Sequence, residues 1–190
     1  MKPVDAERER LRQLLQAEAV KVGDFVLSSG KRANYYIDCR LVTLSAEGAH
    51  LTGQVMLRAL GDPLPDAVAG MSVAADPVVT AVAIASFTAG TPLAALIVRS
   101  QAKEHGTGKQ VEGPLQPGMR VAILEDTVTT GGSVLRAAEA VKEAGGVVTG
   151  IWTLVDRLQG GAVAIAAAGY AYGHIFTIED LGVEPTLHES

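Results

Sequence analysis

The sequence VAILEDTVTTGGS at residues 121–133 contains an apolar run, two adjacent acids and a turn rich in threonine and glycine. The apolar run predicts a buried β-strand, and the apolar stripe that follows Ser133 predicts an α-helix. The turn therefore leads into a helix N-terminus, where backbone N–H groups and the helix dipole favour a phosphate group. Its two glycines let the backbone approach a ligand closely. This pattern is typical of an α/β protein with a phosphate site at the carboxyl edge of its sheet.

The acid pair, Glu125 and Asp126, precedes the turn directly. Acids beside a phosphate cradle would repel a bare phosphate, so we expect them to accept hydrogen bonds from sugar hydroxyls or to hold Mg²⁺ through water, without direct ligation. The alternative is an ordinary strand–helix connection capped by Thr and Ser residues, and the acid pair favours the ligand site. The turn is not a P-loop, because the GTGK at 106–109 is followed by Gln110, and no GxGxxG dinucleotide motif is present.

The composition predicts one domain with a sizeable core, because the chain has 190 residues of which 48% are hydrophobic. A net charge of −5 argues against a general nucleic-acid binder, which needs a basic face. The single cysteine, Cys39, cannot form an intrachain disulfide, and the N-terminal residues lack an apolar signal core. No run of about 18 apolar residues is present, so we expect no membrane span and a cytoplasmic location.

The hydrophobic pattern alternates between strands and helices after residue 60. Repeated strand–helix units predict a parallel sheet with helices on both faces. The short runs 25–27 and 35–37 predict a hairpin before this region, and the two tyrosines of the second run are also compatible with a strand that has one buried face. The pattern predicts helices at 5–20, 45–60, 77–88, 134–143 and 159–168, and further strands at 67–71, 93–98, 121–124, 147–155 and 174–178.

The connection at 99–118 interrupts this alternation and reads RSQAKEHGTGKQVEGPLQPG. It is too long and too polar for a compact domain unless it serves as a lid or a binding loop. Arg99, Lys103, His105 and Lys109 form a local basic cluster in an acidic protein, which suits a polyanion such as pyrophosphate. The alternative is a solvated loop without a ligand. Together with the phosphate turn, the cluster favours a loop that forms the second half of one site.

Several motifs match a known family. The stretch EDTVTTGGS resembles the phosphoribosyl pyrophosphate (PRPP) motif of the type I phosphoribosyltransferases. The pattern R-x-x-x-K-x-H-G at 99–106, the stretch FVLSSGKRANYYIDCR at 25–40 and the VDR at 155–157 resemble the catalytic loop, the N-terminal hood and the base-site segment of the orotate phosphoribosyltransferase family. The resemblance covers residues from about 25 to 180. It implies one phosphoribosyltransferase domain, with an N-terminal helix and hood at about 1–42 and a core at about 43–190.

The resemblance also implies the roles of individual residues. PRPP would be bound by Arg99, Lys103, His105, Glu125, Asp126, Thr127, Val128, Thr129, Thr130, Gly131, Gly132 and Ser133. Catalysis would depend on Lys103, Asp126, Arg99 and His105, and orotate would contact Thr129, Arg157, Tyr35 and Tyr36 beneath a hood that includes Ser29 and Gly30. Asp76 would be at most an indirect magnesium contact.

The activity implied by the resemblance is Mg²⁺-dependent transfer of the phosphoribosyl group of PRPP to orotate, a step of pyrimidine biosynthesis. It would take place in a homodimer with shared active sites and without nucleic-acid or membrane partners. Ser28, Ser100 and the pair Ser72-Val73 stand where many family members carry a basic residue, which leaves a slower or regulatory variant open. A purine phosphoribosyltransferase is disfavoured by the hood and Arg157, and a PRPP-sensing regulator by the charge and the length.

Overall fold

A six-stranded sheet forms the centre of the protein, whose computed structural model describes residues 6–26, 32–101 and 109–184. The strand order is β5-β4-β3-β6-β7-β8, and every neighbouring pair is parallel except β4 and β5. The α/β prediction is therefore confirmed, although the sheet is mixed. The strands are β3 (Ala67–Met71), β4 (Ala94–Val98), β5 (Val111–Glu112), β6 (Arg120–Val128), β7 (Val147–Asp156) and β8 (Tyr172–Thr177).

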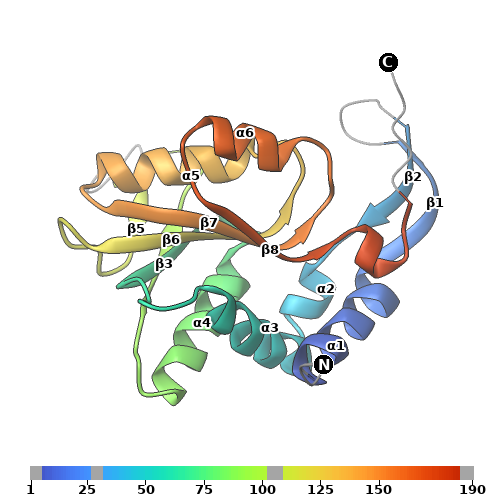
Figure 1. Cartoon of the computed structure of the whole chain (residues 1–190), viewed down its shortest axis with the longest axis horizontal. Helices are drawn as coiled ribbons and strands as arrows, with labels where there is room; N and C mark the ends of the chain where they lie inside the picture. Colours follow the sequence, from blue (N-terminus) through green and yellow to red (C-terminus); the bar gives the residue numbers. More distant parts are fainter. Residues whose placement is uncertain (1–5, 27–31, 102–108, 185–190) are drawn as a thin grey trace.

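Helices cover both faces of this sheet, with α3 (Ala46–Ala59) and α4 (Asp76–Thr88) on one side and α5 (Gly132–Glu143) and α6 (Gly161–Ala167) on the other (Figure 1). Alternate residues of β6 enter opposite cores, because successive side chains of a strand point to opposite faces. Ala122 and Leu124 pack towards α3 and α4, whereas Ile123 packs towards α5. A sheet covered on both faces explains why its strands are almost continuously apolar.

The N-terminal region builds a separate small sheet. Helix α1 (Ala6–Leu14) continues into a π-helical turn, η1 (Leu15–Ala19), and the antiparallel strands β1 (Val20–Val26) and β2 (Arg32–Ile37) follow. The expected helix at 5–20 and the expected hairpin are thus present, although β1 begins earlier than predicted. A further short helix, α2 (Arg40–Thr43), was not predicted, because four residues are too few to show a helical period.

This small sheet is joined to a distant part of the chain (Figure 1). The Arg8 guanidinium donates to the Ile175 carbonyl oxygen at 2.6 Å. On β2, the Asn34 amide donates to the Glu184 carbonyl oxygen at 3.1 Å. Between these contacts lies the short 3-10 helix η2 (Glu179–Leu181). Strand β8 and the segment that follows it therefore hold the N-terminal region against the core.

Two expected boundaries near the sheet edge were wrong, and one short strand was not expected. Strand β6 does not end at residue 124 but continues to Val128, because its parallel pairing with β7 extends as far as Val128 opposite Asp156. Helix α6 begins at Gly161 rather than at 159, because Gly160 has a left-handed φ of +89°. The long connection after β4 contains the two-residue strand β5. In the described part of the chain, no helix is long and apolar enough to cross a membrane.

Candidate functional site

The phosphate turn lies between β6 and α5, as the sequence predicted. It surrounds a hollow of about 110 Å³ lined by residue 125 and residues 127–134. Gly131 caps α5 with a left-handed φ of +85°, and a Cβ at this position would lie 3.3 Å from the Gly161 carbonyl oxygen. Glycine is therefore required for the backbone to turn here. The first N–H groups of α5 have no partner within the helix, so they are available to an anion.

Glu125 lines this hollow, and Asp126, the next residue of β6, is also buried. Glu125 is 4% and Asp126 is 8% exposed, and the two carboxylates are adjacent in the chain. Burial and then the charge of Asp126 raise the pKa of Glu125 to about 8, although a hydrogen bond with Ser133 opposes the rise. Burial also raises the pKa of Asp126 to about 6, although the Thr127 N–H and the positive charge of Arg40 oppose it. The pair therefore retains a proton near neutral pH until a ligand supplies donors or positive charge.

Metal ligands are sparse around the acid pair. In residues 6–26, 32–101 and 109–184, no three His, Cys, Asp or Glu side chains come together as a metal site. Two carboxylates beside a phosphate hollow fit a hydrated Mg²⁺ ion that they would hold through its water ligands.

The part of the site where orotate is expected is built around Arg157, which follows β7. Its Nε donates to the Tyr35 hydroxyl at 2.9 Å, and its guanidinium carbon lies 4.9 Å from the centre of the Tyr35 ring. Its Nη1 lies 3.5 Å from the Thr129 hydroxyl in the phosphate turn. Three residues of the expected orotate set thus meet in one place, although they come from β2, the turn and the end of β7. The guanidinium of Arg157 connects the N-terminal sheet with the phosphate turn.

Other residues predicted to belong to the site do not join the cluster of Arg157, Tyr35 and Thr129. Tyr36 points away from the buried Tyr35, is 40% exposed and packs beside Phe25, with ring centres 6.0 Å apart. Val128 is buried, so only its backbone can face a ligand. The Thr127 hydroxyl donates to the buried Cys39 sulfur at 3.5 Å. These two residues at the end of β6 therefore contribute backbone rather than side chains in this arrangement.

The basic loop is only partly described. Arg99 lies at its start, where its Nε donates to Glu112 at 3.0 Å and its backbone N–H donates to the Gln110 carbonyl oxygen at 2.9 Å. Strand β3 separates β4, which ends just before Arg99, from the acid pair on β6. The predicted residues Lys103 and His105 lie outside the described residues, as do Ser28, Ser29 and Gly30.

Two residues near the site were not assigned a role from the sequence. Arg40, at the start of α2, forms an ion pair with Asp38 at 2.8 Å and acts electrostatically on Asp126. Gln159 donates to the Tyr35 hydroxyl at 3.4 Å. The position of Arg40 at the end of the hood motif was the available signal. No pattern indicated Gln159, because it fell at the expected start of a helix.

The fold, the buried acid pair and the phosphate turn together define a type I phosphoribosyltransferase. No family model matches the chain. The orotate phosphoribosyltransferase of Thermosynechococcus vestitus is 50% identical over 175 residues, which cover 92% of this chain and 92% of that protein. The chain belongs to the orotate phosphoribosyltransferase family.

Solved structures agree with this assignment. The Mycobacterium tuberculosis H37Rv orotate phosphoribosyltransferase in complex with Fe(III) dicitrate has a TM-score of 0.84 and 41% identity, over 93% of this chain and 99% of that chain. The same enzyme in complex with PRPP has a TM-score of 0.80 and 37% identity, again over 93% and 99%. The similarity therefore includes the N-terminal sheet as well as the core.

Proposed function

We propose that the protein transfers the phosphoribosyl group of PRPP to N1 of orotate, giving orotidine 5′-monophosphate and pyrophosphate. The C1–oxygen bond to pyrophosphate breaks, the leaving group takes the electron pair, and a C1–N1 bond forms as N1 loses its proton. Positive charge develops on the ribose in the transition state, and negative charge develops on the leaving group. No covalent nucleophile is needed, so the protein acts by positioning and by electrostatic stabilisation.

The acid pair and the turn would hold PRPP in this reaction. The N–H groups around Gly131 and Gly132 suit the 5′-phosphate, and the carboxylates of Glu125 and Asp126 suit the ribose hydroxyls. Mg²⁺, when bound, supplies positive charge to the pyrophosphate. The acid pair would contact the ion through water. A chelator should abolish turnover, and added Mg²⁺ should restore it.

The observation that carries the choice of base is the position of Arg157 beside Thr129. A guanidinium is a bidentate donor that suits the carboxylate of a planar pyrimidine. Because its Nε is already bonded to Tyr35, the two terminal nitrogens form the edge that can meet this anion. A purine base carries no carboxylate, so Arg157 would have no such partner in a purine-specific enzyme.

The experiment that tests this proposal compares bases. Release of pyrophosphate from PRPP should be fast with orotate and close to background with uracil, adenine and hypoxanthine. Arg157→Ala should raise the KM for orotate by about tenfold or more, the effect of losing a charged hydrogen bond of roughly 1.5–3 kcal/mol. The KM for PRPP should change little. A fall in PRPP affinity with an unchanged KM for orotate would contradict the assignment.

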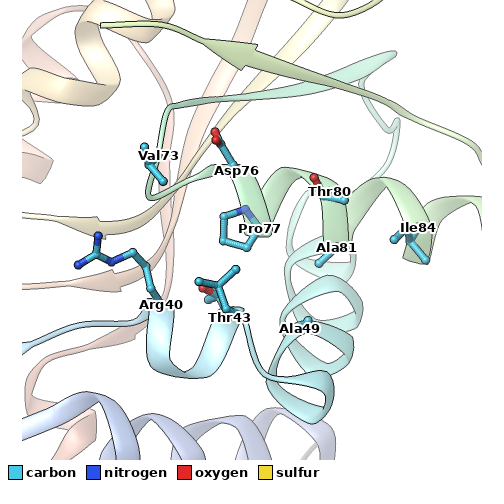
Figure 2. A pocket seen from close by; sticks show the side chains of 10 residues that line it. Arg40, Thr43, Ala49, Val73, Asp76, Pro77, Thr80, Ala81 and Ile84 are labelled. Atoms are coloured by element: carbon cyan, nitrogen blue, oxygen red, sulfur yellow. The ribbon is translucent and has the colours of Figure 1, made fainter.

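We further propose that the protein acts as a homodimer in the cytoplasm. A groove of about 420 Å³ lies along α2, α3 and the first turns of α4 (Figure 2). Leu44, Val73 and Ile84 line it and are 70%, 69% and 64% exposed. Exposed apolar side chains around one hollow are typical of a protein interface. Arg40 also lines this groove and acts on Asp126, so a second copy bound here would lie beside the acid pair.

A charged substitution in the groove tests whether it is the dimer interface. Ile84→Glu should convert the dimer to a monomer in sedimentation experiments, because it places a carboxylate in an apolar contact. Val163→Glu is the matched control, since Val163 is 74% exposed on α6, away from the groove. A dimer that survives Ile84→Glu would place the interface elsewhere.

A shared site requires that the basic loop acts on the neighbouring subunit. Lys103→Ala damages the loop, Asp126→Asn damages the turn, and each homodimer should be almost inactive. After random subunit exchange, about half of the dimers are heterodimers with one intact site each, so activity should approach about a quarter of wild type. Heterodimers that form without a return of activity would show that Lys103 acts within its own subunit.

A further inference from the structure

Asp156 is a buried acid that the proposed reaction does not use. It ends β7, is 2% exposed, and both of its carboxylate oxygens accept hydrogen bonds. Oδ1 accepts the Leu158 backbone N–H at 2.8 Å, and Oδ2 accepts the Tyr172 hydroxyl at 2.9 Å. The carboxylate therefore connects the loop that follows β7 with the first residue of β8.

The loop that Asp156 holds has an unusual backbone. Leu158 has a positive φ of +58°, and it is the only non-glycine residue with a positive φ among residues 6–26, 32–101 and 109–184. Side chains disfavour this left-handed conformation, so it requires support from its surroundings. An aspartate that accepts the N–H two residues later provides such support, because this bond closes an Asx turn. The chain bends here, immediately after Arg157.

Arg157 is consequently anchored on both sides. Its own N–H donates to the Val128 carbonyl oxygen at 2.9 Å, and the residue that follows it is held by Asp156. Its guanidinium donates to Tyr35 and Thr129, and no hydrogen bond to Asp156 is present in the described part of the chain. The positive charge of Arg157 therefore remains available to an anion, although a carboxylate lies next to it in the sequence.

Tyr172 keeps this arrangement over a wide pH range. Burial, the hydrogen bond to Asp156 and the negative charge of Asp156 all raise the pKa of the Tyr172 hydroxyl well above its usual range. The hydroxyl thus stays protonated and continues to donate. Its ring packs against the core between the sheet and α5, which fixes the hydroxyl in place.

We propose that Asp156 and Tyr172 are positioning residues of the base site. Together they hold the turn at Leu158, and this turn directs the guanidinium of Arg157 towards the carboxylate of the base. Neither residue touches the substrate. The inference rests on the proposed function, because it requires that Arg157 binds orotate.

Three substitutions separate positioning from a purely structural role. Tyr172→Phe removes one hydrogen bond and retains the ring, and should raise the KM for orotate by about threefold to tenfold. Asp156→Ala removes both bonds and should raise it by roughly tenfold or more. Asp156→Asn should restore a KM close to that of wild type, because its Oδ1 still accepts the Leu158 N–H and its amide can donate to the Tyr172 oxygen. The KM for PRPP should stay within about twofold throughout.

The matched control is Tyr170→Phe, which removes a hydroxyl from a neighbouring tyrosine that packs on the same core. It should leave both KM values unchanged. The inference is overturned if Tyr172→Phe lowers only the melting temperature, or if the KM values for orotate and PRPP rise together. If Asp156→Ala does not fold, Tyr172→Phe alone decides the question.

Wild type and Arg157→Ala, measured in the same assay, distinguish two kinds of failure. If wild type does not use orotate, the proposed function is wrong. If wild type uses orotate and Arg157→Ala raises its KM, but Tyr172→Phe and Asp156→Ala do not, only the positioning inference is wrong.

Discussion

Replacing Glu125 with glutamine should make the protein more stable at alkaline pH. The Glu125 side chain is almost fully buried beside Asp126, and burial raises its pKa to about 8. In the unfolded chain the same carboxyl loses its proton near its ordinary value of 4.5. Between these two values the folded state binds one proton more than the unfolded state, so stability falls as the pH rises and becomes constant above the folded pKa. Glutamine does not titrate, so this loss should disappear.

The magnitude follows from the difference between the two states. Each pKa unit corresponds to about 1.4 kcal/mol, and the interaction with Asp126 divides the shift between two groups, so we expect a gain of about 1–3 kcal/mol at pH 8. For a chain of this size, each kcal/mol corresponds to roughly 2–4 °C in melting temperature. At about pH 5 the buried carboxyl is protonated in wild type as well, so the difference should be small.

Thermal unfolding at about pH 5 and pH 8, at one protein concentration, measures this effect. Glu47→Gln is the matched control, because Glu47 is an exposed acid that accepts the Arg10 guanidinium at 2.7 Å, and this bond lowers its pKa. The stabilisation from a lowered pKa is present above the unfolded value and is lost only at lower pH, so the control should show no gain between the two conditions. If the stability difference between Glu125→Gln and wild type is the same at both pH values, the reasoning is refuted.

Asp126→Asn should lower kcat/KM by about tenfold to a thousandfold, the range for one lost transition-state contact, and near-normal turnover would remove the acid pair from the reaction. Gly131→Ala should weaken PRPP binding and lower the melting temperature, because the left-handed backbone would cost about 1–2 kcal/mol with a side chain; calorimetry that finds no change would contradict this. Tyr35→Phe should raise the KM for orotate by roughly threefold to tenfold, because Arg157 loses its acceptor, and the KM for PRPP should stay constant. Equal rises in both KM values would place Tyr35 outside the base site.

The sequence predicted the order of the core elements and the phosphate turn, but not where β6 ends. Glu125 and Asp126 interrupt the apolar run, so the strand appeared to finish at residue 124. Pairing with β7 extends it to Val128, because backbone hydrogen bonds between strands do not depend on side-chain polarity. The acids therefore lie within the strand and are buried, which is the cause of their raised pKa values.

The members of the base site were predicted from the resemblance, but their mutual contacts were not. Tyr35 and Arg157 are 122 positions apart, and no local periodicity reports a hydrogen bond over that separation. Local pattern also could not reveal β5, because two residues are too short for an alternation. The roles of individual site residues and the boundary near residue 42 remain predictions.

The contacts of Arg8 with Ile175 and of Asn34 with Glu184 have a consequence for protein synthesis. These partners are separated by 167 and 150 positions, so the ribosome makes the second member of each pair long after the first. Strands β3, β4 and β6 emerge together and can pair while the chain is still growing, because domains begin to fold during synthesis. The N-terminal sheet, although translated early, cannot dock through these contacts until β8 and the segment after it have been made. The nascent protein therefore acquires its phosphate turn first and completes its base site last.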